Sequence, residues 1–165
     1  MYQILDVAAY IVSRYSVENN GCMIDEMKLH KLLYFAQKES YIQTDKPLFN
    51  EKFEGWKYGP VSTDVRDAYG KNTFSKTRAL NTFKVTQDFV NIMDSVFNMY
   101  ASKDSWTLSR LTHSETSWKN SRKDLSDGAN GSNTILDNDI ILDAKIAKNH
   151  RLNLIRNKLL QGKSN

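Results

Sequence analysis

The sequence predicts a mainly α-helical fold: a compact single domain of about five to six helices with a small β element near residues 49–57 and 82–86. Apolar residues recur at three-and-four spacing in several segments, which is the period of one face of an amphipathic helix. A chain of 165 residues has the length of one domain and can bury roughly two thirds of the surface that its unfolded form exposes. We therefore expect one domain over residues 1–165.

Composition and charge describe a soluble globular protein. Hydrophobic residues make up 40% of the chain and charged residues 25%, which is ordinary for such a protein. The longest uncharged apolar runs fall far short of the roughly 20 residues that a membrane helix needs, and the N-terminus lacks the pattern of a secretory signal. The single Cys22 cannot form an internal disulfide, and no Cys/His set has the spacing of a zinc site. We predict a cytoplasmic protein without a metal.

The first two helices follow from apolar periodicity and from signals that start or stop a helix. Residues 2–15 carry one apolar face, and the Asn19-Asn20-Gly21 run ends that helix. A second helix begins near Asp25, whose carboxylate suits an N-cap, and fades near Tyr41. The inner face of this second helix consists of Leu29, Leu32, Leu33 and Ala36.

The stretch 48–68 changes the direction of the chain. Proline fixes its own φ and pushes the preceding residue out of the α region, so Gly59-Pro60 marks a turn. We expect Pro60 at or near the first turn of a short helix that Gly70 ends. The extended stretch before Trp56 is a weak strand, and residues 82–86 alternate polar and apolar side chains, so the two segments can pair.

Two further helices and a loop complete the middle of the chain. Thr86 can cap a helix that carries a second strong apolar stripe. Ser105 can cap another helix, which leads to His113. Residues 121–134 hold glycine, serine, asparagine and aspartate but little apolar surface, so we expect a long loop there.

The last helix, over about residues 138–160, is basic. No acidic side chain follows Asp143, so this segment can meet nucleic acid, an acidic protein surface or only water. Its cationic side chains are those of Lys145, Lys148, Arg151, Arg156 and Lys158.

His113 is the catalytic candidate to examine, because Glu115 and Trp118 follow it closely. An imidazole oriented by a carboxylate is the usual arrangement of a general base. We favour the competing interpretation, a buried histidine that fixes a corner with Trp118 as its packing partner. His113-Ser114-Glu115 also matches the start of a zinc deaminase signature, but the required cysteines are absent.

Motifs of enzymes and cofactor sites are absent elsewhere. The sequence holds no Gly-x-Ser-x-Gly elbow, phosphate-cradling glycine loop or dinucleotide fingerprint. We therefore predict a protein that is not an enzyme and binds no cofactor. Trp56-Lys57-Tyr58 places aromatic rings beside a positive charge, which suits a protein interface and also the stacking of nucleic-acid bases. Because no charge stripe accompanies these rings, the protein interface is the better interpretation.

Three segments taken together resemble the Panacea, or SocA-like, antitoxin domain, which is also labelled phage-associated protein. They are MKLHKLLYFAQ at 27–37, FEGWKYGPV at 53–61 and LSRLTHSETSW at 108–118. Their order and spacing match that family over about residues 27–118. The resemblance marks as motif residues, and as candidates for a toxin interface, His30, Tyr34, Trp56, Lys57, Tyr58, Gly59, Pro60, His113, Glu115 and Trp118.

The resemblance implies a bacterial or phage-borne antitoxin that neutralises a toxin protein by direct binding. In this family the toxin is commonly encoded by the adjacent gene, and the namesake member acts as an adaptor that presents its toxin to an ATP-dependent protease. The partner-specific part tends to lie outside the shared motifs, which makes the basic segment after Asp143 a candidate contact. Two alternatives stay open: a hydrolase or transferase that uses His113 and Glu115, and a nucleic-acid-binding module that uses the basic C-terminal helix.

Overall fold

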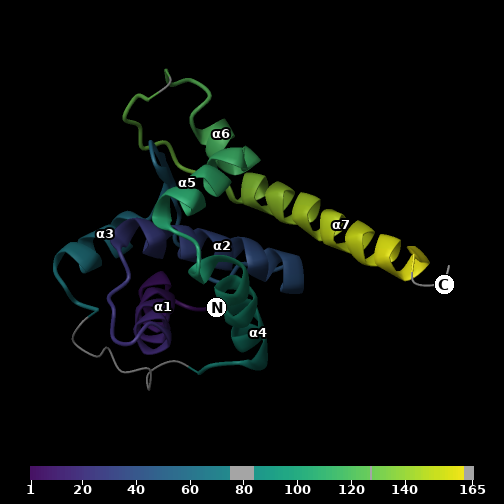
Figure 1. The fold of residues 1–165 in the computed structure, drawn as a ribbon. Helices are drawn as coiled ribbons and strands as arrows, with labels where there is room; N and C mark the ends of the chain where they lie inside the picture. Colours follow the sequence, from purple (N-terminus) through teal and green to yellow (C-terminus); the bar gives the residue numbers. More distant parts are fainter. Residues whose placement is uncertain (75–83, 127, 162–165) are drawn as a thin grey trace.

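The computed structural model describes residues 1–74, 84–126 and 128–161, and these residues form a mainly helical domain with one small antiparallel sheet (Figure 1). The predicted fold class is confirmed. In chain order the elements are α1 (Ile4–Glu18), α2 (Glu26–Thr44), β1 (Glu54–Trp56), β2 (Gly59–Val61), α3 (Thr63–Gly70), α4 (Gln87–Val96), the π-helical segment η1 (Phe97–Ala101), α5 (Ser105–Ser114), α6 (Thr116–Ser121) and α7 (Asp137–Gln161).

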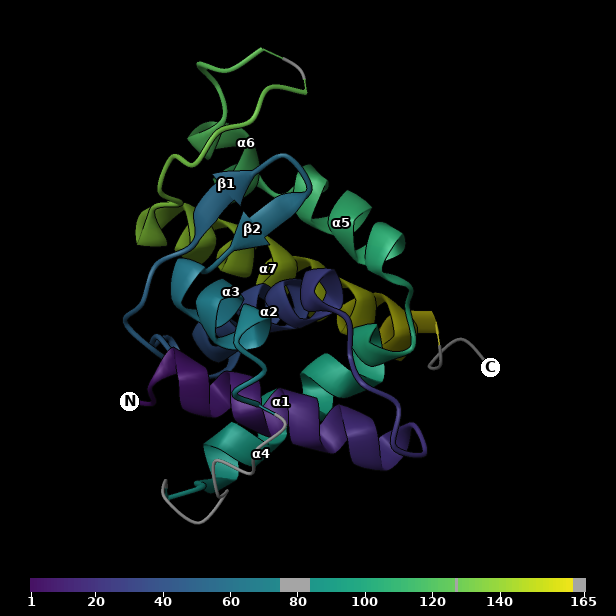
Figure 2. The ribbon, with the colours of Figure 1, turned by 90° about the vertical axis from the view of Figure 1, so that its left-hand side faces the viewer.

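Helix α2 lies at the centre of the fold. The helices α1, α4, α5 and α7 all contact it, and the sheet lies against it as well (Figure 2). Every residue from Lys28 to Ile42 is buried, whereas the sequence predicted burial of one face. A helix covered on all sides is normally apolar all round. Here the polar residues of α2 are buried too, and most of them bond to groups on other elements.

Side chains of the residue before the first turn cap α2, α3, α4 and α5. The Asp25 carboxylate accepts a hydrogen bond from the Lys28 backbone N–H (2.9 Å), so the predicted start of α2 is confirmed. Thr86 caps α4, also as predicted. The cap of α5 was predicted one residue too late, because Asp104 rather than Ser105 accepts a hydrogen bond from a first-turn N–H, that of Thr107 (2.9 Å). Aspartate and serine are both good N-caps, and the negative charge of Asp104 also favours the positive end of the helix dipole.

The sheet is a tight hairpin between α2 and α5. Its strands pair antiparallel, with Trp56 opposite Gly59 and Glu54 opposite Val61. Pro60 therefore lies within β2, and its predicted place in the first turn of a helix is wrong. A proline is tolerated in an edge strand where its missing N–H is not needed for the ladder. Helix α3 instead begins after Ser62, whose hydroxyl caps it.

The predicted pairing of the segment before Trp56 with residues 82–86 is also wrong. The partner of β1 is β2. Residues 82 and 83 lie outside the described residues, and Lys84 to Thr86 form no strand. The third segment that reaches the sheet comes from the loop after α6, where Thr134 bridges to Glu54 and the Gly55 N–H donates to the Asn133 carbonyl (2.8 Å).

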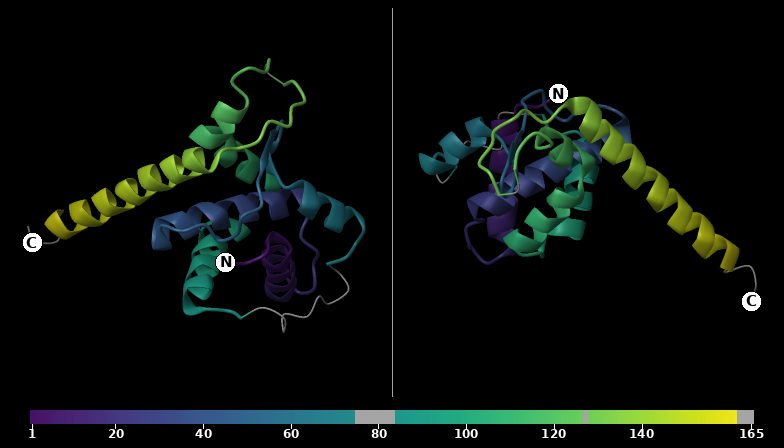
Figure 3. Two further views of the ribbon diagram at one scale, coloured as in Figure 1. Left: turned by 180° about the vertical axis from the view of Figure 1, so that it is seen from behind. Right: turned by 90° about the horizontal axis from the view of Figure 1, so that it is seen from above.

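Helix α7 begins within the fold and then leaves it. Ile140, Asp143 and Ala144 are buried in its first turns. Lys148 and Arg151 still pair with Asp45 and Glu39, and the end of the helix extends away from the other elements, which both views of Figure 3 show. Among the described residues, no helix combines the length and apolarity that crossing a membrane requires.

Candidate functional site

The three motifs converge on the hairpin. The first motif lies on α2, the second forms the hairpin, and the third covers α5 and the start of α6. From α2, Lys31 donates a hydrogen bond to the Pro60 carbonyl (3.2 Å). From α5, the Ser109 hydroxyl donates to the Tyr58 carbonyl (3.0 Å), and from α6 the Trp118 indole donates to the Trp56 carbonyl (2.9 Å). The motifs therefore form one contiguous region of the fold.

Gly59 allows the hairpin to lie this close to its neighbours. Its φ is +109°, a conformation that residues with a side chain rarely adopt. A Cβ atom at this position would lie 2.5 Å from Thr112 Oγ1 and 2.7 Å from Lys31 Cε. Both the turn and the close approach therefore require glycine.

His30 is buried beneath the hairpin. Its Nδ1 accepts a hydrogen bond from the Ser62 backbone N–H (3.3 Å), while Nε2 has no hydrogen-bond partner among the described residues. Glu26 Oε1 lies 3.6 Å from Nε2, just beyond hydrogen-bond distance. Burial lowers the pKa of His30 below its ordinary value, so the ring is neutral near pH 7.

Lys31 is a buried amine with no carboxylate partner in the part of the chain that the structure describes. Only 1% of its surface is exposed, and the Pro60 carbonyl is its hydrogen-bond acceptor. Burial lowers the pKa of Lys31 to about 7, although the charges of Asp25 and Glu26 act in the opposite direction. An amine in such a position changes its charge near neutral pH.

Tyr34 belongs to a buried network that joins α2, α6 and α7. Its hydroxyl lies 2.7 Å from Ser117 Oγ. Asp143 of α7 accepts hydrogen bonds from the backbone N–H groups of Thr116 (2.8 Å) and Ser117 (2.9 Å). A carboxylate at the N-terminus of a helix stabilises it through these N–H groups. Burial raises the pKa of Tyr34 well above its ordinary value, which fits a structural hydroxyl.

The structure does not pair His113 with Glu115. The His113 ring stacks on the Trp118 ring with centroids 4.0 Å apart, and its Nε2 lies 3.4 Å from Ser109 Oγ. Burial, with a smaller effect of the Lys31 charge, lowers the pKa of His113. Glu115 instead accepts a hydrogen bond from Lys38 (2.6 Å), while its burial raises its pKa. The packing of His113 on Trp118 is as the favoured interpretation expects, but His113 is half-buried rather than buried.

Two cavities flank the hairpin turn, and Lys57 and Tyr58 line both of them. The first has a volume of about 810 Å³ and lies between α2, the hairpin, α3 and the loop after α6. The second has a volume of about 590 Å³ and lies between the hairpin, α5, α6 and the same loop. Its lining includes the aromatic or cationic residues Trp106, Arg110, His113, Trp118, Lys119 and Arg122.

The sequence patterns did not single out several residues that line the cavities. Lys31 follows His30 directly in the first motif, yet periodicity placed it beside the apolar face rather than inside the fold. Its burial depends on the hairpin that covers α2, which is a tertiary contact. Arg66 and Trp106 lie on helix surfaces, and only the folded chain brings each beside an aromatic ring of the hairpin.

The cations of α7 divide into two groups. Arg151 pairs with the buried Glu39 through two hydrogen bonds (2.8 and 2.7 Å), and Lys148 pairs with Asp45 (3.3 Å). Lys145, Arg156 and Lys158 form no ion pair within the described part of the chain. The first group holds the helix to α2, and the second is left in solvent.

The described residues also lack a cluster of histidine, cysteine, aspartate or glutamate side chains that could hold a metal ion.

The fold and the site thus describe a helical domain with two cavities beside a hairpin and a projecting basic helix. A family model described as antitoxin SocA-like, Panacea domain, matches residues 29–119, more than half of the chain. The chain belongs to this family, and the resemblance seen in the three motifs is confirmed.

A curated relative is similar over part of this region. It is Antitoxin SocA of Caulobacter vibrioides (strain NA1000 / CB15N), 41% identical over 49 residues. The match covers 30% of this chain and 26% of that protein, so the chain matches about a quarter of the relative's length. No solved structure matches the chain at a significant level.

Proposed function

We propose that this protein is a non-enzymatic antitoxin that neutralises a toxin protein by binding it directly. Membership of the SocA-like family carries the proposal. The separate partners of His113 and Glu115 add to it, because a general base needs its orienting carboxylate within reach. Their contacts with Trp118 and Lys38 disfavour the alternative of a hydrolase or transferase.

The distal half of α7, residues 149–161, is the proposed toxin contact. Large exposed apolar patches on a protein surface often mark interaction sites. This segment of α7 carries apolar side chains that are exposed to solvent. Its large apolar side chains, each 48–63% exposed, are those of Leu152, Leu154, Ile155, Leu159 and Leu160.

Charge determines what kind of partner fits this segment. Arg156 and Lys158 stand among the apolar side chains, and residues 149–161 hold no carboxylate side chain. A second copy of the chain would place cations against cations, which repel. An apolar groove with an acidic rim on the toxin satisfies both features, because Leu152, Ile155 and Leu159 have the i, i+3, i+7 spacing with which helices bind grooves on other proteins.

Co-expression with the product of the adjacent gene tests this function. That product alone should stop growth, and growth should return when this protein is produced with it. A neighbour that is harmless alone, or whose toxicity this protein leaves unchanged, would contradict the proposal.

The same experiment distinguishes two routes of neutralisation. In a host that lacks its ATP-dependent proteases, rescue persists if the antitoxin blocks the toxin by occlusion. Rescue fails, and the toxin accumulates, if the antitoxin delivers the toxin for proteolysis.

A further inference from the structure

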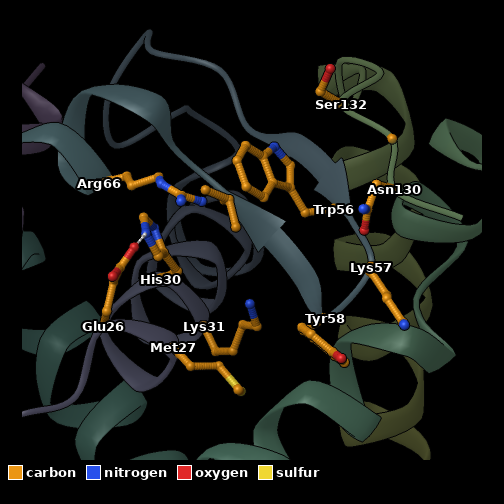
Figure 4. A pocket seen from close by; sticks show the side chains of 12 residues that line it. Glu26, Met27, His30, Lys31, Trp56, Lys57, Tyr58, Arg66, Asn130 and Ser132 are labelled. Atoms are coloured by element: carbon orange, nitrogen blue, oxygen red, sulfur yellow. Dashed lines mark ion pairs between the residues drawn. The ribbon is translucent and has the colours of Figure 1, made fainter. Parts of the chain in front are cut away.

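We propose that the first cavity binds a small molecule through a carboxylate or phosphate group. Figure 4 shows the cavity, with His30 and Lys31 on α2 below the Trp56 ring and Arg66 beside that ring. Its volume of about 810 Å³ lies within the range of small-molecule sites. The proposal is independent of toxin binding, because the distal half of α7 takes no part in this cavity.

The first observation is a buried donor that makes no hydrogen bond among the described residues, since the Glu26 carboxylate oxygen lies 3.6 Å from it. Nδ1 of His30 accepts the Ser62 N–H, and the neutral ring therefore carries its proton on Nε2. The histidine is only 2% exposed, and Nε2 has no hydrogen-bond partner among the described residues. A buried donor without a partner is costly, so a ligand oxygen at this position would offset a cost that the fold otherwise bears.

The second observation concerns Lys31, which lines the same cavity. Its amine has three donors when charged, and one hydrogen bond, to the Pro60 carbonyl, is present. No carboxylate pairs with it in the described residues, unlike Lys38, which pairs with Glu115. An anion beside the amine would supply acceptors and favour its charged form.

The walls of the cavity explain why the ligand is a small molecule with an apolar body. The Arg66 guanidinium lies 4.5 Å from the Trp56 ring centroid and presents further donors at the rim. Lys57 and Arg66 contribute two cationic side chains, and Lys31 an amine that changes its charge near pH 7, against one carboxylate, that of Glu26. Met27, Trp56 and Val61 supply the apolar part of the lining.

The test is a calorimetric titration of the purified protein at pH 7 with three compounds. These are phenyl phosphate, benzoate and the neutral benzyl alcohol. At least one anion should bind about tenfold or more tightly than the alcohol, because a charge-assisted hydrogen bond has no counterpart there. Binding by phenyl phosphate alone assigns a phosphate, and binding by benzoate alone assigns a carboxylate; either result supports the proposal.

Variants connect the binding to the cavity. Lys31→Met and Arg66→Gln should each weaken anion binding, Lys31→Met by about tenfold or more. Lys71→Met removes the same charge from an exposed position outside the cavity and should leave the affinity unchanged. If Lys31→Met does not fold, as judged by circular dichroism, the rim variant Arg66→Gln decides the question.

Three results would overturn the proposal. One is the absence of anion binding at millimolar concentrations. Another is binding that Arg66→Gln and Lys31→Met both leave unchanged. The third is loss of toxin binding in Lys31→Met together with no anion binding, which would assign the cavity to an acidic side chain of the partner protein instead.

Discussion

Buried polar side chains on α2 connect this helix to most of its neighbours. Gln37 donates to the Phe49 carbonyl (3.0 Å), Lys38 pairs with Glu115, and Glu39 pairs with Arg151. Each pairing joins α2 to a different segment of the chain. A buried group that is paired contributes little net stability, but removing one partner is costly. These residues therefore specify how the segments are placed around α2.

Lys31, unlike Lys38 and Glu39, has no oppositely charged partner among the described residues, and its burial makes the stability of the fold depend on pH. Its pKa is about 7 in the folded protein and 10.5 in the unfolded chain. Between these values the unfolded chain binds more protons, so the free energy of unfolding rises with pH, by at most about 1.4 kcal/mol per pH unit. Urea denaturation should show greater stability at pH 9 than at pH 7.

The variant Lys31→Met should remove most of this rise, because methionine has a similar length and no charge to bury. Lys71→Met, at an exposed position, should keep it. A wild-type protein whose stability is the same at pH 7 and pH 9 would show that Lys31 is not held in the way its burial indicates.

At the scale of elements, the hairpin depends on the glycine that turns it. Gly59→Ala combines an unfavourable φ with contacts to Thr112 and Lys31 that a Cβ would crowd. We expect the free energy of unfolding to fall by about 1–3 kcal/mol, measured by urea denaturation.

Gly70→Ala is the matched control for the hairpin variant. Gly70 is the last residue of α3, and a Cβ there would meet nothing within 4 Å. Alanine also favours a helix over glycine by up to about 1 kcal/mol. This variant should be neutral or slightly stabilising, and equal losses in the two variants would contradict the account of Gly59.

Local signals predicted most of the helices. The caps Asp25 and Thr86 are where the sequence placed them, because an N-cap depends on a side chain and the backbone within three residues of it. The apolar period of α1 was equally clear. Where a start was misplaced, as at Ser105, the error was one residue, since Asp104 offers the same type of acceptor.

Pairing between elements was not predictable in the same way. Residues 82–86 and β2 both offered short extended segments, and Gly59-Pro60 was equally compatible with a strand and with a helix start. The two-residue turn at Lys57 and Tyr58 settles the pairing. For the candidate site, the motifs identified His30, Trp56 and the hairpin, but the burial of Lys31 appears only once the hairpin covers α2.

At the scale of the molecule, two parts of the chain differ in how far they are packed. The helices around α2 and the hairpin form a body whose polar groups are mostly paired internally. Helix α7 begins in this body, where Asp143 caps α6, and its distal half then projects into solvent (Figure 1). A rigid connection to the body gives the projecting half a fixed direction, which lowers the entropy cost of binding a partner.

The most direct test of the central claim is the affinity for the toxin of a purified double variant. This variant combines Leu152→Asp and Ile155→Asp. Both side chains are exposed, at 57% and 56%, so the melting temperature of the body should stay close to that of the wild type. Leu142→Asp, at a 44% exposed position of the same helix next to the body, is the control. We predict that the double variant weakens binding by about tenfold or more, while the control binds as the wild type does. A double variant that binds the toxin as tightly as the wild type would contradict the claim that the distal half of α7 is the toxin contact.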